Sequence, residues 1–167
     1  VIARGANLMI EYFNDPEQTA DFFKLNDGWG WSGDLATIDE DGFVSLVDRV
    51  KDMIISGGEN VFPKEIEIAI YEIEQVSECA VFGIPDETWG EVPAAFISLK
   101  PGASLDEEKV LSWCAERLAR FKRPRRVFFG DVPRNPTGKI EKPLLREQYR
   151  NEGQTLSGIP PVPPLKN

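Results

Sequence analysis

Apolar residues in the first third of the chain fall into short runs that predict strands, with one helix between them. Residues 8–13 form a strand-like run, and Asp15 and Pro16 then offer a helix N-cap followed by proline in the first turn. A helix is therefore expected to about Phe23. Two further apolar runs between residues 35 and 47 are split at 39–42 by acidic residues and a glycine, which is typical of a β-hairpin.

After residue 50 the apolar residues become denser and alternate between strand and helix periods. A strand-like run at 53–55 leads into Ser-Gly-Gly-Glu-Asn at 56–60, which indicates a second hairpin, and Pro63 then opens a helix. Spacings of three and four residues place the apolar side chains of that helix on one face. These side chains are Ile66, Ala69, Ile70 and Ile73.

The remainder of this region predicts three more strands and two more helices. Ser104 and Glu107 match a capping box, so a helix is expected there that runs to Leu118, and a last short helix begins at Pro143. The expected strands cover 79–83, 93–99 and 127–129. This order predicts an α+β fold: a short central sheet flanked by helices to about residue 150, behind a mostly β segment whose partner strands are missing.

The overall composition is that of an ordinary soluble protein. With 41% hydrophobic residues and no apolar run long enough to span a bilayer, a cytoplasmic protein is expected, and peripheral membrane association stays open. The lack of histidine excludes Ser-His-Asp catalysis and His-bound metal sites. Cys79 and Cys114 lie in apolar patterns, which favours buried free thiols over a disulfide. Residues 151–167 hold four prolines and predict a flexible tail.

The net charge of −9 hides a basic segment near the end of the chain. Residues 117–150 carry eleven Lys or Arg against three Asp or Glu, so the rest of the chain is strongly acidic. Such a segment binds a nucleic acid, an anionic membrane surface or a phosphorylated small molecule, or it is simply the solvated face of helices and loops. Charge alone leaves these alternatives open.

Three polar loops carry residues that could take part in chemistry. Asp34 follows Ser-Gly at the start of a strand, where a carboxylate can accept hydrogen bonds from two hydroxyls or can satisfy its own turn. Arg49 and Lys51 lie in a charged connection ahead of the glycine pair, which also reads as a plain solvated hairpin. Lys139 follows Asn-Pro-Thr-Gly and is either a point charge for phosphate or carboxylate or a surface lysine. The spacing of a P-loop is absent.

Taken together and in this order, the motifs resemble the adenylate-forming superfamily of acyl-CoA synthetases, aryl-CoA ligases, luciferases and peptide-synthetase adenylation domains. The resemblance covers roughly residues 5 to 150, and its glycine-pair motif is closest to the CoA-ligase form. The motifs include Ser-Gly-Asp at 32–34, Asp-Arg-Val-Lys-Asp at 48–52, Ser-Gly-Gly-Glu-Asn at 56–60, Trp-Gly-Glu at 89–91, Phe-Lys-Arg-Pro at 121–124 and Pro-Arg-Asn-Pro-Thr-Gly-Lys at 133–139.

The resemblance implies an acyl-CoA synthetase. A carboxylic acid, in the first instance a fatty acid, reacts with ATP to give acyl-AMP, and the acyl group then passes to coenzyme A. Asp34 is implied to bind the ribose hydroxyls of ATP with the support of Arg49, and Lys139 to bridge the acid and the α-phosphate. Lys51 matches the hinge about which a small domain turns between the two steps. Mg²⁺ is implied with ATP, with its site mostly outside this segment.

The resemblance also implies a domain order. Residues 1–48 are similar to the end of the large AMP-binding domain, 49–52 to the hinge and 53–150 to the C-terminal lid domain. The N-terminal domain of the same polypeptide would supply the phosphate loop and acyl pocket, so this segment alone is expected to be inactive. The implied coenzyme A contacts are Gly57, Gly58, Glu59, Phe121, Arg123 and Arg125.

Two alternatives stay open beside this resemblance. One is an adenylation domain that loads the thiol of a carrier protein in place of coenzyme A. The other is a non-catalytic module that binds a polyanion through residues 117–150. The second is disfavoured because the basic residues are not interleaved with several aromatic side chains and the whole chain is acidic, so nucleic acid is not expected as a partner.

Overall fold

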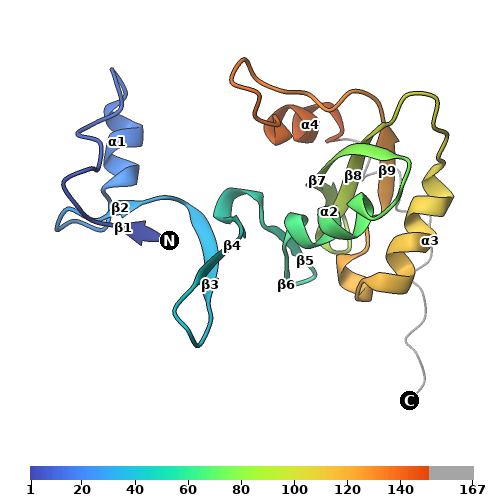
Figure 1. The fold of residues 1–167 in the computed structure, drawn as a ribbon, viewed down its shortest axis with the longest axis horizontal. Coiled ribbons are helices and arrows are strands. Elements are labelled where there is room, and N and C mark those ends of the chain that lie inside the picture. The colour runs from blue at the N-terminus through green and yellow to red at the C-terminus, as the bar shows by residue number, and fades with distance from the viewer. Residues whose placement is uncertain (151–167) are drawn as a thin grey trace. The chain divides into compact units, whose positions relative to one another are not determined.

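Residues 1–150 are described by a computed structural model, in which the chain divides into two units between Lys51 and Asp52. The first unit is Val1–Lys51 and the second begins at Asp52. The tail expected at 151–167 lies outside the described residues. Figure 1 labels the elements of both units.

The first unit contains two small antiparallel sheets and one helix. The predicted hairpin is confirmed as the pair β3–β4, and β1 pairs with β2. The helix begins where expected, because the Asp15 carboxylate accepts a hydrogen bond from the backbone N–H of Gln18 and proline follows the cap. The elements are β1 (Ile2–Ala3), α1 (Pro16–Phe22), β2 (Gly30–Trp31), β3 (Asp34–Ile38) and β4 (Val44–Arg49).

The strand expected at 8–13 is wrong. These residues form bends and turns, and Ile10 and Phe13 are each 91% exposed. A strand needs a neighbour for its N–H and C=O groups, and no strand among the described residues pairs with this run.

The second unit is built on a five-stranded sheet with helices on both faces (Figure 1). Strands β7 and β8 form a long antiparallel hairpin, β9 runs parallel to β8, and the β5–β6 hairpin joins β8 at Ser56. The elements are η1 (Val50–Asp52, a 3₁₀ turn at the boundary), β5 (Ile54–Ser56), β6 (Glu59–Val61), α2 (Pro63–Tyr71), β7 (Val76–Asp86), β8 (Gly90–Leu99), α3 (Glu107–Arg117), η2 (Arg120–Lys122, also 3₁₀), β9 (Arg126–Phe129) and α4 (Lys142–Gln148).

Alternation along β7 produces a core on each face of this sheet. Cys79 and Val81 point to the face covered by α2 and α3, whereas Ala80, Phe82 and Ile84 point to the face covered by α4. All five side chains are fully buried. The helix face expected in α2 and the apolar residues of α3 are buried in the first of these cores. The α+β fold class is therefore confirmed.

Two local predictions for the second unit had different outcomes: the cap of α3 is wrong, and the state of the cysteines is confirmed. The capping box at Ser104 is wrong, because the N-cap of α3 is Asp106, whose carboxylate accepts from the backbone N–H of Lys109 at 2.9 Å. Glu107 turns instead toward β9, where it accepts from Val127 N. The two cysteines are free and buried, as predicted. Burial raises the pKa of both thiols, that of Cys114 to about 11.

Candidate functional site

The register of the β3–β4 hairpin brings Asp34 and Arg49 together. The two residues are direct partners across the strands, and Arg49 Nε lies 3.5 Å from Asp34 Oδ1. A carboxylate carries lone pairs on both oxygens, so Asp34 can accept from further donors beside Arg49. Asp34 is half-buried and Arg49 exposed, which leaves both charges accessible to a polar ligand.

Lys51 lies in η1 and is the last residue of the first unit. Its side chain is exposed. A short 3₁₀ turn has poorer hydrogen-bond geometry than an α-helix, so its backbone changes conformation at lower cost. The position suits a pivot, and the hinge at Lys51 stays a prediction.

Lys139 is held on a turn that the side chain of Asn135 fixes from within. Asn135 Oδ1 accepts from Thr137 N, Thr137 Oγ1 and Lys139 N at 3.1, 2.8 and 2.9 Å. Gly138 closes the turn with φ +83°, a conformation that strains any residue with a Cβ. Lys139 is exposed, and within residues 1–150 its ammonium joins no salt bridge. The structure therefore presents an available cation on a rigid loop.

Arg134 ties the base of this turn to the sheet. Its guanidinium donates to Gly138 O at 2.5 Å and to Glu78 Oε1 on β7 at 2.8 Å, and the Arg134 backbone bridges to Ile140. The hydrogen bond to Glu78 raises the pKa of Arg134 above its ordinary value. Both ends of the Lys139 turn are thus anchored.

The glycine turn between β5 and β6 packs against the turn between β7 and β8. Gly57 and Gly58 have φ values of +60° and +86°, and Gly57 N donates to Trp89 O at 2.8 Å. A Cβ on Gly57 would lie 2.5 Å from the Trp89 ring, so no side chain fits there without a shift. With Glu59 also exposed, this turn offers open backbone beside an indole.

The other expected coenzyme A residues lie on or just after η2, which contacts β6. Phe121 is 39% exposed. Arg123 is already committed in part, because its Nε donates to Leu118 O at 3.0 Å, and the backbone N–H of Arg125 donates to Pro93 O. The structure therefore brings η2 close to the strand that carries Glu59, with one aromatic ring exposed for stacking.

The sequence did not predict two salt bridges that hold α4 in place. Lys142 Nζ lies 2.8 Å from Glu67 Oε1, and Glu67, which is buried in α2, also accepts from Val81 N. Arg146 donates to Asp52 Oδ1 at 2.9 Å. One signal was available: Glu67 falls on the apolar face of α2, where a carboxylate must find a partner.

The described part of the chain contains no recognisable metal-binding cluster and no helix suited to cross a membrane. Residues 1–150 contain no group of three or more Cys, Asp or Glu side chains arranged to hold a metal ion. No chemical step proposed for this protein is assigned to a metal ion held by these residues. None of the described helices is long and apolar enough to cross a membrane.

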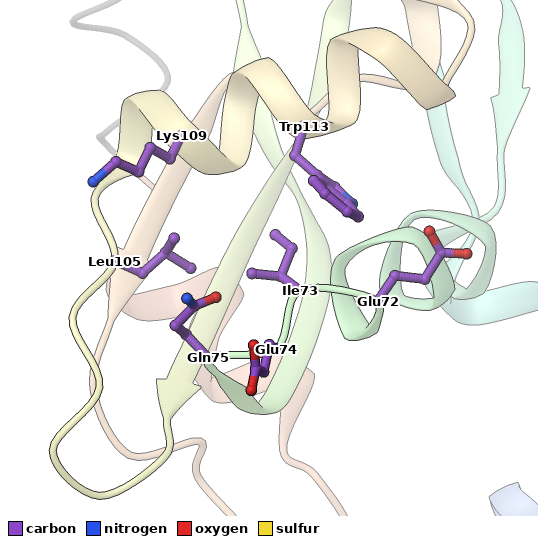
Figure 2. A pocket seen from close by; sticks show the side chains of 7 residues that line it. All are labelled: Glu72, Ile73, Glu74, Gln75, Leu105, Lys109 and Trp113. Carbon is purple, nitrogen blue, oxygen red and sulfur yellow. The ribbon is translucent and has the colours of Figure 1, made fainter.

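A hollow lies between the end of α2 and the start of α3 in the second unit. Its wall includes Ile73, Leu105 and Trp113, and Figure 2 shows their side chains around the opening. The Trp113 indole N–H is already used by Ala69 O at 2.8 Å. None of the expected site residues lines this hollow, so its apolar wall belongs to the packing of α2 on α3 and not to the chemistry.

Comparison with known proteins identifies relatives of both units. Residues 65–139 match the family model of the AMP-binding enzyme C-terminal domain. A methyl-dioxo-octahydroindenyl-propanoyl:CoA ligase of Rhodococcus jostii is 50% identical over 151 residues, and a long-chain-fatty-acid–CoA ligase of Mycobacterium tuberculosis is 49% identical over 150 residues. These matches cover 90% and 89% of this chain but only 29% of each relative. The chain thus spans less than a third of their length.

Solved structures also match most of this chain and less than a third of their own length. The ATP-bound MatB of Rhodopseudomonas palustris matches with a TM-score of 0.81 and 40% identity, over 92% of this chain and 31% of its own. The o-succinylbenzoate CoA synthetase of Bacillus subtilis, in complex with its acyl-adenylate, matches with a TM-score of 0.78 and 36% identity, over 87% and 29%.

Proposed function

We propose that the whole protein is an AMP-forming acyl-CoA synthetase. Residues 65–139 of this chain belong to the family of AMP-binding enzyme C-terminal domains. The observation that carries this proposal is 50% identity over 151 residues to a CoA ligase, a stretch that includes the Asp34–Arg49 pair and the Lys139 turn. The protein would join a carboxylic acid to coenzyme A at the expense of ATP. Residues 1–167 would contribute nucleotide contacts, the pivot and the mobile lid.

In the first half-reaction a carboxylate oxygen attacks the α-phosphorus of ATP and pyrophosphate leaves. The Asp34 carboxylate would accept hydrogen bonds from the ribose hydroxyls, while Arg49 keeps that carboxylate oriented. The Lys139 ammonium would lie between the carboxylate and the α-phosphate, offsetting the repulsion of two anions. The Asn135-fixed turn supports this role, because a fixed cation pays little reorganisation cost at the moment of reaction.

In the second half-reaction the thiol sulfur of coenzyme A attacks the acyl carbon, AMP leaves and the thiol proton is released. Rotation at Lys51 would withdraw Lys139 and present another face of the lid. Gly57, Gly58 and Glu59 would then border the pantetheine arm. Phe121 would stack on the adenine, with Arg123 and Arg125 near the phosphates.

The choice of acid lies outside this segment. Relatives that share 45–50% identity with it are named for acids as unlike as a long-chain fatty acid, 4-hydroxybutyrate and ferulate. A sequence shared among such different ligases holds the common chemistry of nucleotide and thiol. The missing acyl pocket would set the substrate.

The test separates the two half-reactions in the complete enzyme. Lys139→Ala is expected to slow acyl-AMP formation about 10²–10³-fold, as measured by ATP–pyrophosphate exchange, and to spare thioester formation from preformed acyl-AMP. Lys51→Pro should do the reverse, because proline fixes φ at the pivot. Lys100→Ala, which removes another exposed lysine, is the matched control and should change neither step. Equal loss of both steps in Lys139→Ala would contradict its assigned role.

The identity of the acyl acceptor needs a separate test. The structural matches include an amide bond synthetase of Marinactinospora thermotolerans, with a TM-score of 0.78 and 36% identity. Coenzyme A, a pantetheinylated carrier protein and a simple amine should each be offered to the preformed acyl-AMP. Coenzyme A is expected to react fastest. Preference for the carrier or the amine would reassign the second half-reaction and leave the first unchanged.

A further inference from the structure

The Lys139 turn is flanked by three cations, each paired with an acid on a different element. Arg134 precedes the turn and binds Glu78 on β7. Lys142 and Arg146 follow the turn on α4 and bind Glu67 on α2 and Asp52 at the start of the unit. These three ion pairs are short, with N–O distances of 2.8, 2.8 and 2.9 Å. Neither the sequence motifs nor the proposed mechanism gives these partners a role.

The Asp52–Arg146 pair joins two positions that are 94 residues apart in the sequence. The side chains are only 19% and 30% exposed, so solvent screens the pair less than an ordinary surface contact. Lys142 and Arg146 are four residues apart on α4, so they share one side of that helix and hold it at two points. Asp52 directly follows Lys51 in the chain, which places one anchor next to the proposed pivot.

We propose that Arg146 is a positioning residue for Lys139, and that its ion pair with Asp52 fixes the Lys139 turn relative to the backbone at the pivot. This inference rests on the proposed function. Leu145 buries one side of α4 in the core beside Phe82 and Phe96, while the two ion pairs set the rotation and height of the helix. Because the turn leads directly into α4, a shift of that helix moves the Lys139 ammonium away from the reacting phosphate. A displacement of about 1 Å is enough to slow a reaction about 10²-fold.

The experiment compares Arg146→Met with Arg117→Met in the complete enzyme. Arg117 is a fair control, because it is 33% exposed and ion-paired to Glu72 on the α2 side of the sheet, away from the turn. Arg146→Met is expected to lower kcat for acyl-AMP formation at least about tenfold, with KM for ATP within about twofold and thioester formation from preformed acyl-AMP unchanged. Arg146→Lys should recover part of the loss, and Asp52→Arg combined with Arg146→Asp should recover part of it as well.

Amide hydrogen exchange supplies a readout that does not need activity. Arg146→Met should speed exchange of the Thr137 and Lys139 amides at least about threefold, and Arg117→Met should not. Unchanged exchange at these two amides would overturn the inference, and so would an equal fall of both half-reactions in Arg146→Met. If the wild-type enzyme forms no acyl-AMP with any acid while the exchange result holds, the proposed function fails and the positioning of the turn stands.

Discussion

The two units of this chain hold their polar groups in place by different means. Among residues 52–150 of the second unit, every buried hydrophobic side chain lies in one of two cores, between Ile54 and Leu145. In the first unit no hydrophobic residue is buried, and Phe43 and Leu46 are 69% and 68% exposed. Asp34 meets Arg49 through strand register alone, whereas the Lys139 turn is anchored to a packed sheet.

This difference shows that strand pairing can bring two polar side chains together without a hydrophobic core. How firmly such a contact is held then depends on whether a packed core supports it. A hairpin is marginal by itself, and a unit of this length rarely buries enough apolar surface to fold alone. The first unit relies on backbone pairing and on surface contacts such as Lys24 over the Trp31 ring. We therefore expect stability to reside in the second unit and nucleotide contacts in both.

The sharpest way to break this comparison is a matched pair of Phe→Ala changes. Phe82→Ala should cost about 3–5 kcal/mol of unfolding free energy, because Phe82 is fully buried between β7 and α4. Phe43→Ala should cost less than about 0.5 kcal/mol in the 167-residue chain, since it empties no core. Urea unfolding followed by circular dichroism measures both. Similar losses from the two changes would mean that the first unit has a core of its own.

A second prediction is that a side chain of the first unit contributes to ATP binding but little to the free energy of unfolding. Asp34→Asn in the complete enzyme should raise KM for ATP about 10–100-fold, because a charge-assisted contact contributes about 1.5–3 kcal/mol. Its unfolding free energy should change by less than about 1 kcal/mol, since the pair with Arg49 is long and partly exposed. Asp21→Asn, which removes another exposed ion pair of this unit, is the control and should leave KM unchanged.

The smallest expected effect concerns the thiols of the second unit at neutral pH. Cys79 and Cys114 are buried, and burial raises the pKa of both above that of an unfolded cysteine. Neither should react with Ellman's reagent at pH 8 until the chain unfolds. Unfolding free energy should be insensitive to these groups below about pH 8 and should fall above about pH 9, because only the unfolded state releases the protons there. Cys114→Ala should flatten that alkaline fall.

Most of the second unit could be predicted from its sequence because its signals are local. Pro63 and the spacing of Ile66 and Ile70 specify α2, and two glycines specify the β5–β6 turn. The strand at 8–13 failed because a strand also needs a partner, which no local pattern supplies. The α3 cap moved from Ser104 to Asp106 because Glu107 is used by β9, a contact twenty residues away.

The candidate site also contains residues that local motifs predict and partners that only the folded chain brings together. The motifs named Asp34, Arg49 and Lys139, and the structure adds how each is held. The partners of α4 could not be named from spacing, because Asp52 and Arg146 lie 94 residues apart in the sequence and only the folded unit brings them together. Glu67 was readable in principle as a charge on an apolar face, but its partner Lys142 was not.

The Asn135 turn also bears on how the protein ages chemically. Asparagine deamidates when the backbone nitrogen of the next residue attacks its side-chain amide and closes a succinimide ring. The next residue here is Pro136, whose ring nitrogen carries no hydrogen and cannot make that attack. The amide that orders Thr137 and Lys139 is therefore protected by its own neighbour, and long storage should leave the geometry of this loop intact.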